Sequence, residues 1–216
     1  MKDTPILSLS ATRFAAGLLA SLSVAVAFAQ TSPVPTVRMR GVVQAVTATS
    51  VTVKDRSGEV VELVTNDKLV VSEVYPIALE DIKPGSFIGT AALPQPDGSL
   101  KAIAVTVFTE AQRNIPQGEF PFDLQPQSTM TNAIVSDVAT LIAASGTGNG
   151  RKLQLKFKDL EKSLQVASDA PVVTSRPSNR SLLLPGASVS LFAQVIDGKP
   201  TALRVSAGKN GFALPY

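Results

Sequence analysis

The chain has 216 residues and a formal net charge of +3 at pH 7, and it contains no Cys, His or Trp. Without Cys or His it can form no disulfide, no thiolate or imidazole metal site, no Cys nucleophile and no Ser-His-Asp triad. The low net charge and the few aromatic residues also argue against nucleic-acid binding, which needs basic surfaces and rings for base stacking.

The N-terminal segment has the pattern of a cleavable export signal. The basic residues Lys2 and Arg13 lie before an uncharged run over residues 14–28. The small residues Ala27 and Ala29 occupy the positions that signal peptidase favours. The run is shorter than the roughly 20 apolar residues of a membrane-spanning helix. We therefore predict a signal peptide over 1–29, cleavage after Ala29, localisation in the periplasm and no membrane span after cleavage. A retained anchor is the alternative.

After a Pro-rich leader at 30–36, which we expect to be disordered, β-type patterns begin. Alternating apolar residues and a Gly turn at 56–59 predict a hairpin over 50–65. Residues 77–82 are expected to form one or two helical turns before Pro84-Gly85 ends them. The extended segments in chain order are VRMRGVVQAV, SVTVKD, VVELVT, KLVVSEV, SFIGTAAL and KAIAVTVF.

Residues 110–127 interrupt this pattern. Three prolines stand in this stretch, and Pro cannot donate to a sheet ladder. We predict an extended linker here. Phe120, Phe122 and Leu124 alternate within it, which indicates that one of its faces packs against the rest of the chain.

The second half repeats the first half. Four positions recur in the same order, and the separations between them agree to within one residue. The pairs are Asp67 with Asp169, Pro84-Gly85 with Pro185-Gly186, Asp97-Gly98 with Asp197-Gly198, and LKAIAVTV with PTALRVSA. We infer the duplication of a β module of roughly 75 residues.

The fold class is therefore predicted to be all-β, with two tandem OB-fold-like small β-barrels, because each module has about five strands and one short helical element. An SH3-like barrel is the near alternative. The predicted domains are a signal peptide (1–29), a leader (30–36), β-barrel module 1 (37–109), a Pro-rich linker (110–127), β-barrel module 2 (128–211) and a tail (212–216).

The repeated turns are predicted to have structural roles. Pro-Gly ends a helical turn and starts a strand, and Leu79, Ile82 and the segment 182–184 are expected to fill the ends of the barrels. Asp-Gly is typical of hairpin turns. Asp67 and Asp169 are expected to cap turns, and a paired acidic site is the alternative.

No catalytic, metal or cofactor site is predicted, and two other sites are candidates. The linker is the candidate recognition or docking element, through Phe120, Phe122, Asp123 and Leu124. A basic stripe along RKLQLKFK is a candidate surface for anionic ligands, through Arg151, Lys152, Lys156 and Lys158. A packed linker and a solvated strand face are the structural alternatives.

Several stretches carry a resemblance to a known family. They are GVVQAV, LEDIKPGSFIGTAALPQPDGSLKAIAVTVF, EAQR, FDL and STMTNA, and the likeness runs from about Val37 to Gly211. The chain resembles an uncharacterised family of exported proteobacterial proteins that carry an OB-like domain of unknown function. Members are sometimes labelled metal ABC transporter permeases, a label that the lack of further apolar spans does not support. The family usually has a His and a Trp in the linker, whereas this chain has Phe122 in place of the Trp and no His.

The function predicted from these features is that of a non-catalytic periplasmic binding or scaffolding protein, whose partner is an unknown envelope protein or ligand. Two alternatives were weighed against it. One is an envelope enzyme that uses carboxylates alone, and the other is a binder of single-stranded nucleic acid or another anionic ligand.

Overall fold

The computed structural model describes residues 35–141 and 150–216. The predicted signal peptide, most of the leader and most of the Gly-rich turn at 146–150 lie outside the described residues. The regular structure is β-strand apart from three short 3-10 helices, which are η1 (Leu79–Asp81), η2 (Glu110–Gln112) and η3 (Arg180–Leu182). The all-β prediction is confirmed.

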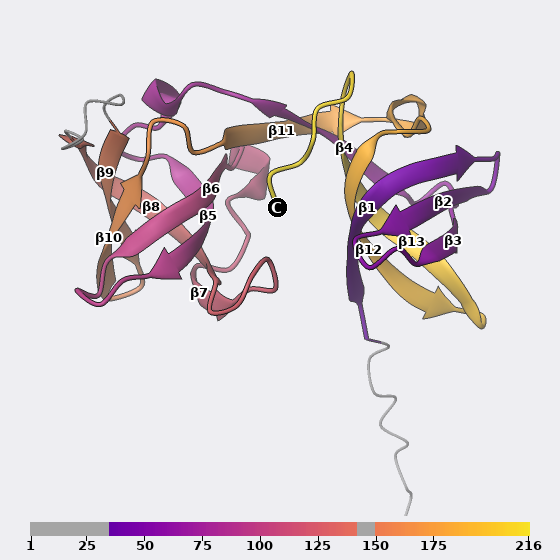
Figure 1. Ribbon diagram of the computed structural model, residues 1–216, viewed down its shortest axis with the longest axis horizontal. Coiled ribbons are helices and arrows are strands. Elements are labelled where there is room, and N and C mark those ends of the chain that lie inside the picture. The colour runs from indigo at the N-terminus through magenta and orange to yellow at the C-terminus, as the bar shows by residue number, and fades with distance from the viewer. Residues whose placement is uncertain (1–34, 142–149) are drawn as a thin grey trace, which may run out of the picture. The chain divides into compact units, whose positions relative to one another are not determined.

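One closed barrel combines strands from the two ends of the chain. Its strands pair in the ring β1-β2-β3-β13-β12-β1, and only the β3–β13 contact is parallel. We call it the terminal barrel (indigo and yellow in Figure 1). Its strands are β1 (Val37–Val46), β2 (Ser50–Asp55), β3 (Val60–Val64), β12 (Ser188–Ile196) and β13 (Lys199–Gly208).

A second ring forms from the middle of the chain in the same way. The order is β8-β9-β10-β6-β5-β8, again with one parallel contact, between β10 and β6. We call it the central barrel. Its strands are β5 (Phe87–Pro94), β6 (Leu100–Val107), β8 (Thr129–Leu141), β9 (Gly150–Phe157) and β10 (Leu160–Val166). Five strands in a closed ring agree with the predicted OB-like fold.

The tandem arrangement of the two modules is not confirmed, because the repeated halves exchange their last hairpins. Strands β1 to β3 of the first half are closed by β12 and β13 of the second, and β8 to β10 are closed by β5 and β6. The sequence repeat explains why this is possible. The two hairpins correspond closely, because their register shifts at matching positions, between Ala91 and Ala92 in β5 and between Phe192 and Ala193 in β12, and each has a positive-φ glycine in its turn.

Two strands carry the chain from one barrel to the other. β4 (Val70–Pro76) and β11 (Val172–Ser178) pair antiparallel along their length. Arg176 of β11 makes two hydrogen bonds to Glu73 of β4, at 3.1 and 2.8 Å, and its guanidinium lies 4.9 Å from the ring centroid of Tyr75. The crossing is therefore joined by backbone bonds and by an ion pair.

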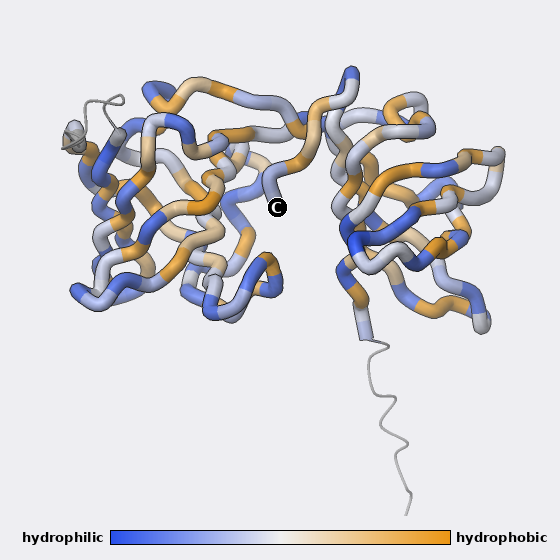
Figure 2. Tube along the Cα trace, viewed as in Figure 1, coloured by the Kyte–Doolittle hydropathy of each residue, from blue (hydrophilic) through white to orange (hydrophobic). Residues whose placement is uncertain are grey.

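Each barrel has its own apolar core, and the inward residues of its strands alternate with polar residues that face out (Figure 2). Largely buried residues from both halves of the sequence meet in each core. In the terminal barrel, Val53 packs with Leu191, and in the central barrel Ile88 packs with Leu155. Cores shared in this way explain how modules too small to bury much surface alone are stabilised without disulfides.

The repeated Pro-Gly turns join the two halves. Gly85 and Gly186 both have φ +88°, a conformation that favours glycine. The amide of Gly85 donates to the carbonyl of Val135 in β8, and the amide of Gly186 donates to that of Val43 in β1, each at 2.8 Å. Each turn thus bonds to the first strand of the other half.

The apolar residues beside these turns fill the barrel ends, with one exception. Leu79 and Ile82 are buried in the central core, and Leu182 and Leu183 in the terminal core. The prediction was wrong for Leu184, which is 62% exposed. The reason is that the plug needs one deeply inserted residue, two positions before the Pro, and Leu184 follows that residue.

The prediction of hairpin turns at Asp97-Gly98 and Asp197-Gly198 is confirmed. Gly98 and Gly198 take positive φ values in the hairpin turns, and the Asp97 carboxylate accepts hydrogen bonds from the amide and hydroxyl of Ser99. The turn at 66–69 is capped by Asn66, whose side-chain oxygen accepts from the amide of Lys68. The capping residue of this turn is therefore Asn66, one position before the predicted Asp67.

Candidate functional site

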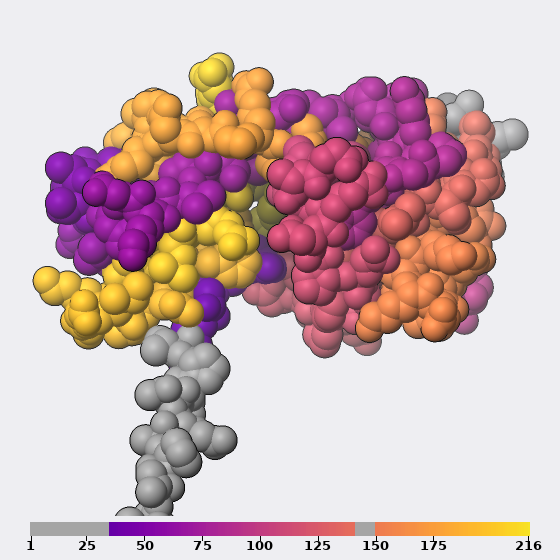
Figure 3. All heavy atoms as spheres, turned by 180° about the vertical axis from the view of Figure 1, so that it is seen from behind, coloured from indigo at the N-terminus to yellow at the C-terminus, as the bar shows by residue number. Residues whose placement is uncertain are grey.

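The linker packs against the central barrel. Its residues 118–121 form β7 (Gly118–Pro121), which pairs antiparallel with the start of β8. The side chain of Asn132 donates to the carbonyl of Pro116 at 3.0 Å, and Arg113 donates to the carbonyl of Gly85 at 3.2 Å. Figure 3 shows linker atoms (rose) gathered on the surface of the molecule. A strand forms in spite of Pro121 because β7 is paired only on the side of β8.

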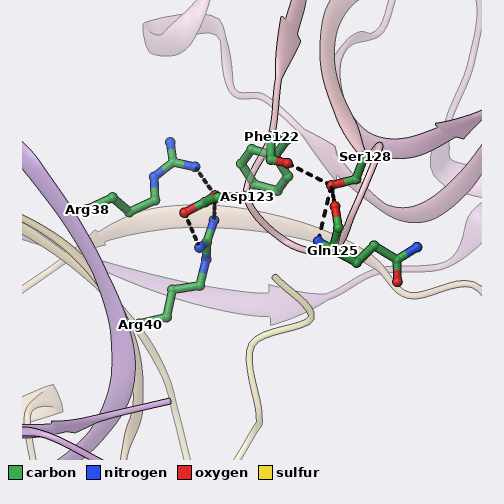
Figure 4. A network of polar contacts seen from close by, with 6 residues as sticks. All are labelled: Arg38, Arg40, Phe122, Asp123, Gln125 and Ser128. Carbon is green, nitrogen blue, oxygen red and sulfur yellow. Dashed lines mark hydrogen bonds and ion pairs between the residues drawn. The ribbon is translucent and has the colours of Figure 1, made fainter. Parts of the chain in front are cut away.

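A tight loop after β7 fixes the position of Phe122 and Asp123. The Ser128 hydroxyl lies 2.9 Å from the carbonyl oxygen of Phe122 and 2.8 Å from that of Gln125, and it accepts from the amide of Gln125 (Figure 4). The amide of Phe122 donates to the carbonyl of Ser128 at 2.9 Å. These bonds close the loop and leave the carboxylate of Asp123 facing outward.

That carboxylate meets an arginine from the other barrel. Arg40 of β1 donates from both terminal nitrogens to the two carboxylate oxygens of Asp123, at 2.9 and 2.8 Å. The Arg40 side chain is only 8% exposed, whereas that of Asp123 is 63% exposed. The hydrogen bonds from Arg40 lower the pKa of Asp123 to about 2. We call this bidentate pair the clasp.

Arg38 lies beside the clasp, because residues two apart on a strand point to the same face. Its guanidinium carbon is 5.1 Å from the ring centroid of Phe122 and 4.9 Å from that of Phe192, so it contacts two aromatic rings. Its shortest approach to Asp123 is 3.9 Å (Figure 4). Within the described part of the chain, its guanidinium donates no hydrogen bond. Burial and the neighbouring Arg40 charge lower the pKa of Arg38.

Arg38 also lines an open pocket of about 380 Å³. Phe120 and Pro121 of β7, together with Met130 of β8, give the pocket an apolar wall. Asn132 completes the lining. A pocket with one apolar wall and a single guanidinium whose donors are unused has the composition of a small-ligand site.

Three of the four predicted linker residues meet here, since Phe120, Phe122 and Asp123 all line the pocket. Leu124 does not line it. The sequence reasoning missed Arg38 and Arg40, and the pattern that could have indicated them is VRMRG, which places two like charges on one face of a predicted strand.

In the second predicted set, the basic stripe, the exposed Lys152 and Lys156 stand on one face of β9 and Arg151 on the other. Its members are Arg151, Lys152, Lys156 and Lys158. Arg151 points to the end of the central barrel and donates to the carbonyl of Ile82 at 3.4 Å. Lys156 stands opposite Glu161 in the β9–β10 pair, and Lys158 occupies the turn between these strands at φ +53°. No contact tests whether these residues bind an anionic ligand, which stays a prediction.

Several acidic residues serve as hydrogen-bond acceptors or ion-pair partners. Among the described carboxyl groups, hydrogen bonds hold the pKa of five below its ordinary value. These groups are Asp55, Glu73, Asp97, Glu110 and Asp123. A general acid at neutral pH needs the opposite shift. Over residues 35–141 and 150–216, no three acidic side chains are grouped so that they could hold a metal ion.

No family model, curated protein or solved structure matches this chain. The resemblance to the exported proteobacterial family therefore stays a prediction. The described part of the chain holds no helix with the length and apolar character that a membrane span requires.

Proposed function

We propose that this chain is a non-catalytic binding protein of the periplasm and that the pocket beside the clasp is its ligand site. The observation that carries the proposal is Arg38. A guanidinium that contacts two aromatic rings and donates no hydrogen bond to any described residue lines a pocket with an apolar wall. The Arg38 side chain is 34% exposed, so a ligand that enters the pocket can bond to its donors without displacing a protein hydrogen-bond partner.

Two features favour binding over catalysis. Asp123 is the one carboxylate among the residues that line the pocket, and it is held by Arg40 at a pKa of about 2. A carboxylate-based hydrolase needs two such groups, one of them protonated near neutral pH. Because its surroundings lower the pKa of Asp123, this carboxylate keeps its charge at neutral pH and suits a structural ion pair rather than proton transfer.

The pocket is tested by screening the purified chain against pools of small acidic, basic and neutral compounds, with thermal shift as the readout. We expect at least one pool to raise the melting temperature of the wild type and to have less effect on Phe120→Ala. Leu160→Ala is the matched control, because it removes another large exposed apolar side chain of the central barrel, 57% exposed against 42% for Phe120, that does not line the pocket.

Two results would contradict the proposal. One is that no pool shifts the melting temperature, and the other is that Phe120→Ala and Leu160→Ala respond as the wild type does. The proposed location is tested separately, by fractionating cells that express the full chain. Recovery of uncleaved protein from the cytoplasm would rule out export.

A further inference from the structure

We infer that the ligand of this pocket is a small monocarboxylate with an apolar body, bound through the guanidinium of Arg38. The inference rests on the proposed function and adds the chemical class of the ligand. Three features of the pocket support it: the net positive charge, the hydrogen-bond donors of Arg38 and the apolar wall.

The charge at the pocket is positive and incompletely neutralised. Arg38 and Arg40 bring two positive charges, and Asp123 brings one negative charge. The two short contacts of Asp123 go to Arg40, which leaves Arg38 with an ion contact of 3.9 Å. Arg204 adds a further positive charge, 6.0 Å from the ring of Phe192 on which Arg38 also lies. An anion is therefore the favoured partner for Arg38.

The shape of the free group favours a carboxylate. A guanidinium has a planar fork of N–H donors that matches the two oxygens of a carboxylate. When an aromatic ring contacts the flat face of a guanidinium, the N–H donors at the edge of the guanidinium remain available for a ligand. The aromatic rings also reduce the exposure of Arg38, whose side chain is 34% exposed, so a counter-ion there is less screened than at an open surface.

The same surroundings disfavour a phosphate dianion. Only one guanidinium is free to receive it, and the mostly exposed carboxylate of Asp123 would lie close to its second charge. Phosphate sites usually gather several donors, such as an Arg cluster or a row of backbone amides. A single negative charge balances Arg38 and meets a weaker repulsion from Asp123 than a dianion does.

The apolar wall accounts for the rest of the ligand. Phe120, Pro121 and Met130 line the pocket together with Arg38, and Phe120 is an exposed large apolar side chain. A volume of about 380 Å³ is at the lower end for ligand pockets and suits a short alkyl or aryl group better than a polymer. The chain thus offers one cation and one apolar wall, which matches a small acid such as hexanoate or phenylacetate.

The inference is tested by calorimetric titration with hexanoate and phenylacetate, with their amides, and with inorganic phosphate. The amides keep the shape and remove the charge. We expect each acid to bind about 10-fold to 100-fold more tightly than its amide, as expected when a charged hydrogen-bonded contact is lost. Phosphate is expected to bind more weakly than either acid.

Variants then locate the contact. Arg38→Gln should bring the affinity for the acid down to that for the amide, and Arg38→Lys should restore part of the difference, because it keeps the charge and loses the fork. Arg56→Gln, in the exposed β2–β3 turn, is the matched control and should bind as the wild type does. Because the acid-to-amide comparison uses wild-type protein, it remains informative if an Arg38 variant does not fold.

Three outcomes would overturn the inference. If acid and amide bind equally and both are weakened by Phe120→Ala, the ligand class is wrong and the pocket remains a binding site. If a peptide with a free C-terminal carboxylate binds more tightly than either small acid, a polypeptide is the ligand. If no probe binds and the pooled screen is also negative, the proposed function fails with the inference.

Discussion

Replacing Asp123 by Asn tests the clasp, because the substitution keeps the shape of the side chain and removes its charge. Asp123 is bonded to an Arg40 side chain that is 8% exposed and whose buried Nε has no partner among the described residues. Removing the carboxylate leaves this guanidinium under-satisfied. Losing one partner costs about 3–5 kcal/mol for a buried pair and roughly 0.2–1 kcal/mol for an exposed pair.

The magnitude follows from the position of the clasp between these limits. The pKa of Asp123 falls from 3.8 to about 2, a difference worth about 2 kcal/mol at full strength. Asp123 is 63% exposed, so solvent screening reduces this value. We expect Asp123→Asn to lower the free energy of unfolding by about 1 kcal/mol at pH 7.

The sign of the pH dependence is fixed by the lowered pKa. A carboxyl group that is more acidic when folded stabilises the protein above its unfolded pKa, and the contribution is lost as the pH falls through the folded pKa. The difference between wild type and Asp123→Asn should therefore be full above about pH 5 and should shrink between pH 4 and pH 2. Urea unfolding followed by circular dichroism measures it, since the chain has no Trp for fluorescence.

Glu110→Gln serves as the control, because it removes a carboxylate from the solvent-exposed pair with Arg113. We expect no measurable loss of stability from it at pH 7. The reasoning would be refuted if Asp123→Asn were no more destabilising than Glu110→Gln. A difference from wild type that stayed constant from pH 7 to pH 2.5 would refute it as well.

Three further predictions test the fold. Leu183→Ala should lower the free energy of unfolding by about 2–5 kcal/mol and Leu184→Ala by less than about 0.5 kcal/mol, because only Leu183 is buried. Equal losses in urea unfolding would show that Leu183 does not fill the end of the terminal barrel. Gly41→Ala should cost about 1–3 kcal/mol or more, since a Cβ there would meet the backbone of β2, and an unchanged melting temperature would contradict this packing. Fragments 37–109 and 128–211 should each remain unfolded alone and form β-structure when mixed, because each barrel needs strands from both fragments. Circular dichroism measures this, and independent folding of either fragment would disprove the exchange of hairpins.

Much of the secondary structure could be predicted from the sequence because its causes are local. Alternation of apolar and polar residues indicates strands, and Pro-Gly and Asp-Gly require particular backbone angles wherever they occur. Gly85 and Gly186 have the same φ although the residues around them differ. The position of Leu184 could not be predicted in this way, since a run of three leucines does not indicate which of them stays outside the core.

The candidate site was predicted in part. The alternating apolar residues of the linker pointed to Phe120 and Phe122, which line the pocket. Arg40 was not predicted, because it stands 83 residues from its partner Asp123. Contacts at such separations depend on how strands pair, and the local pattern of β1 contains no information on the loop that it meets.

By itself, the sequence determined an all-β chain with two copies of one strand order, because strand periodicity and turn conformation are properties of neighbouring residues. It also excluded Cys and His chemistry. Only the tertiary structure decided that the copies exchange their final hairpins and that the linker meets β1. The pairings of β1 with β12 and of β5 with β8 join strands that lie far apart in the sequence, so the exchange, and with it the pocket at Arg38, depends on contacts between distant parts of the chain rather than between neighbouring residues.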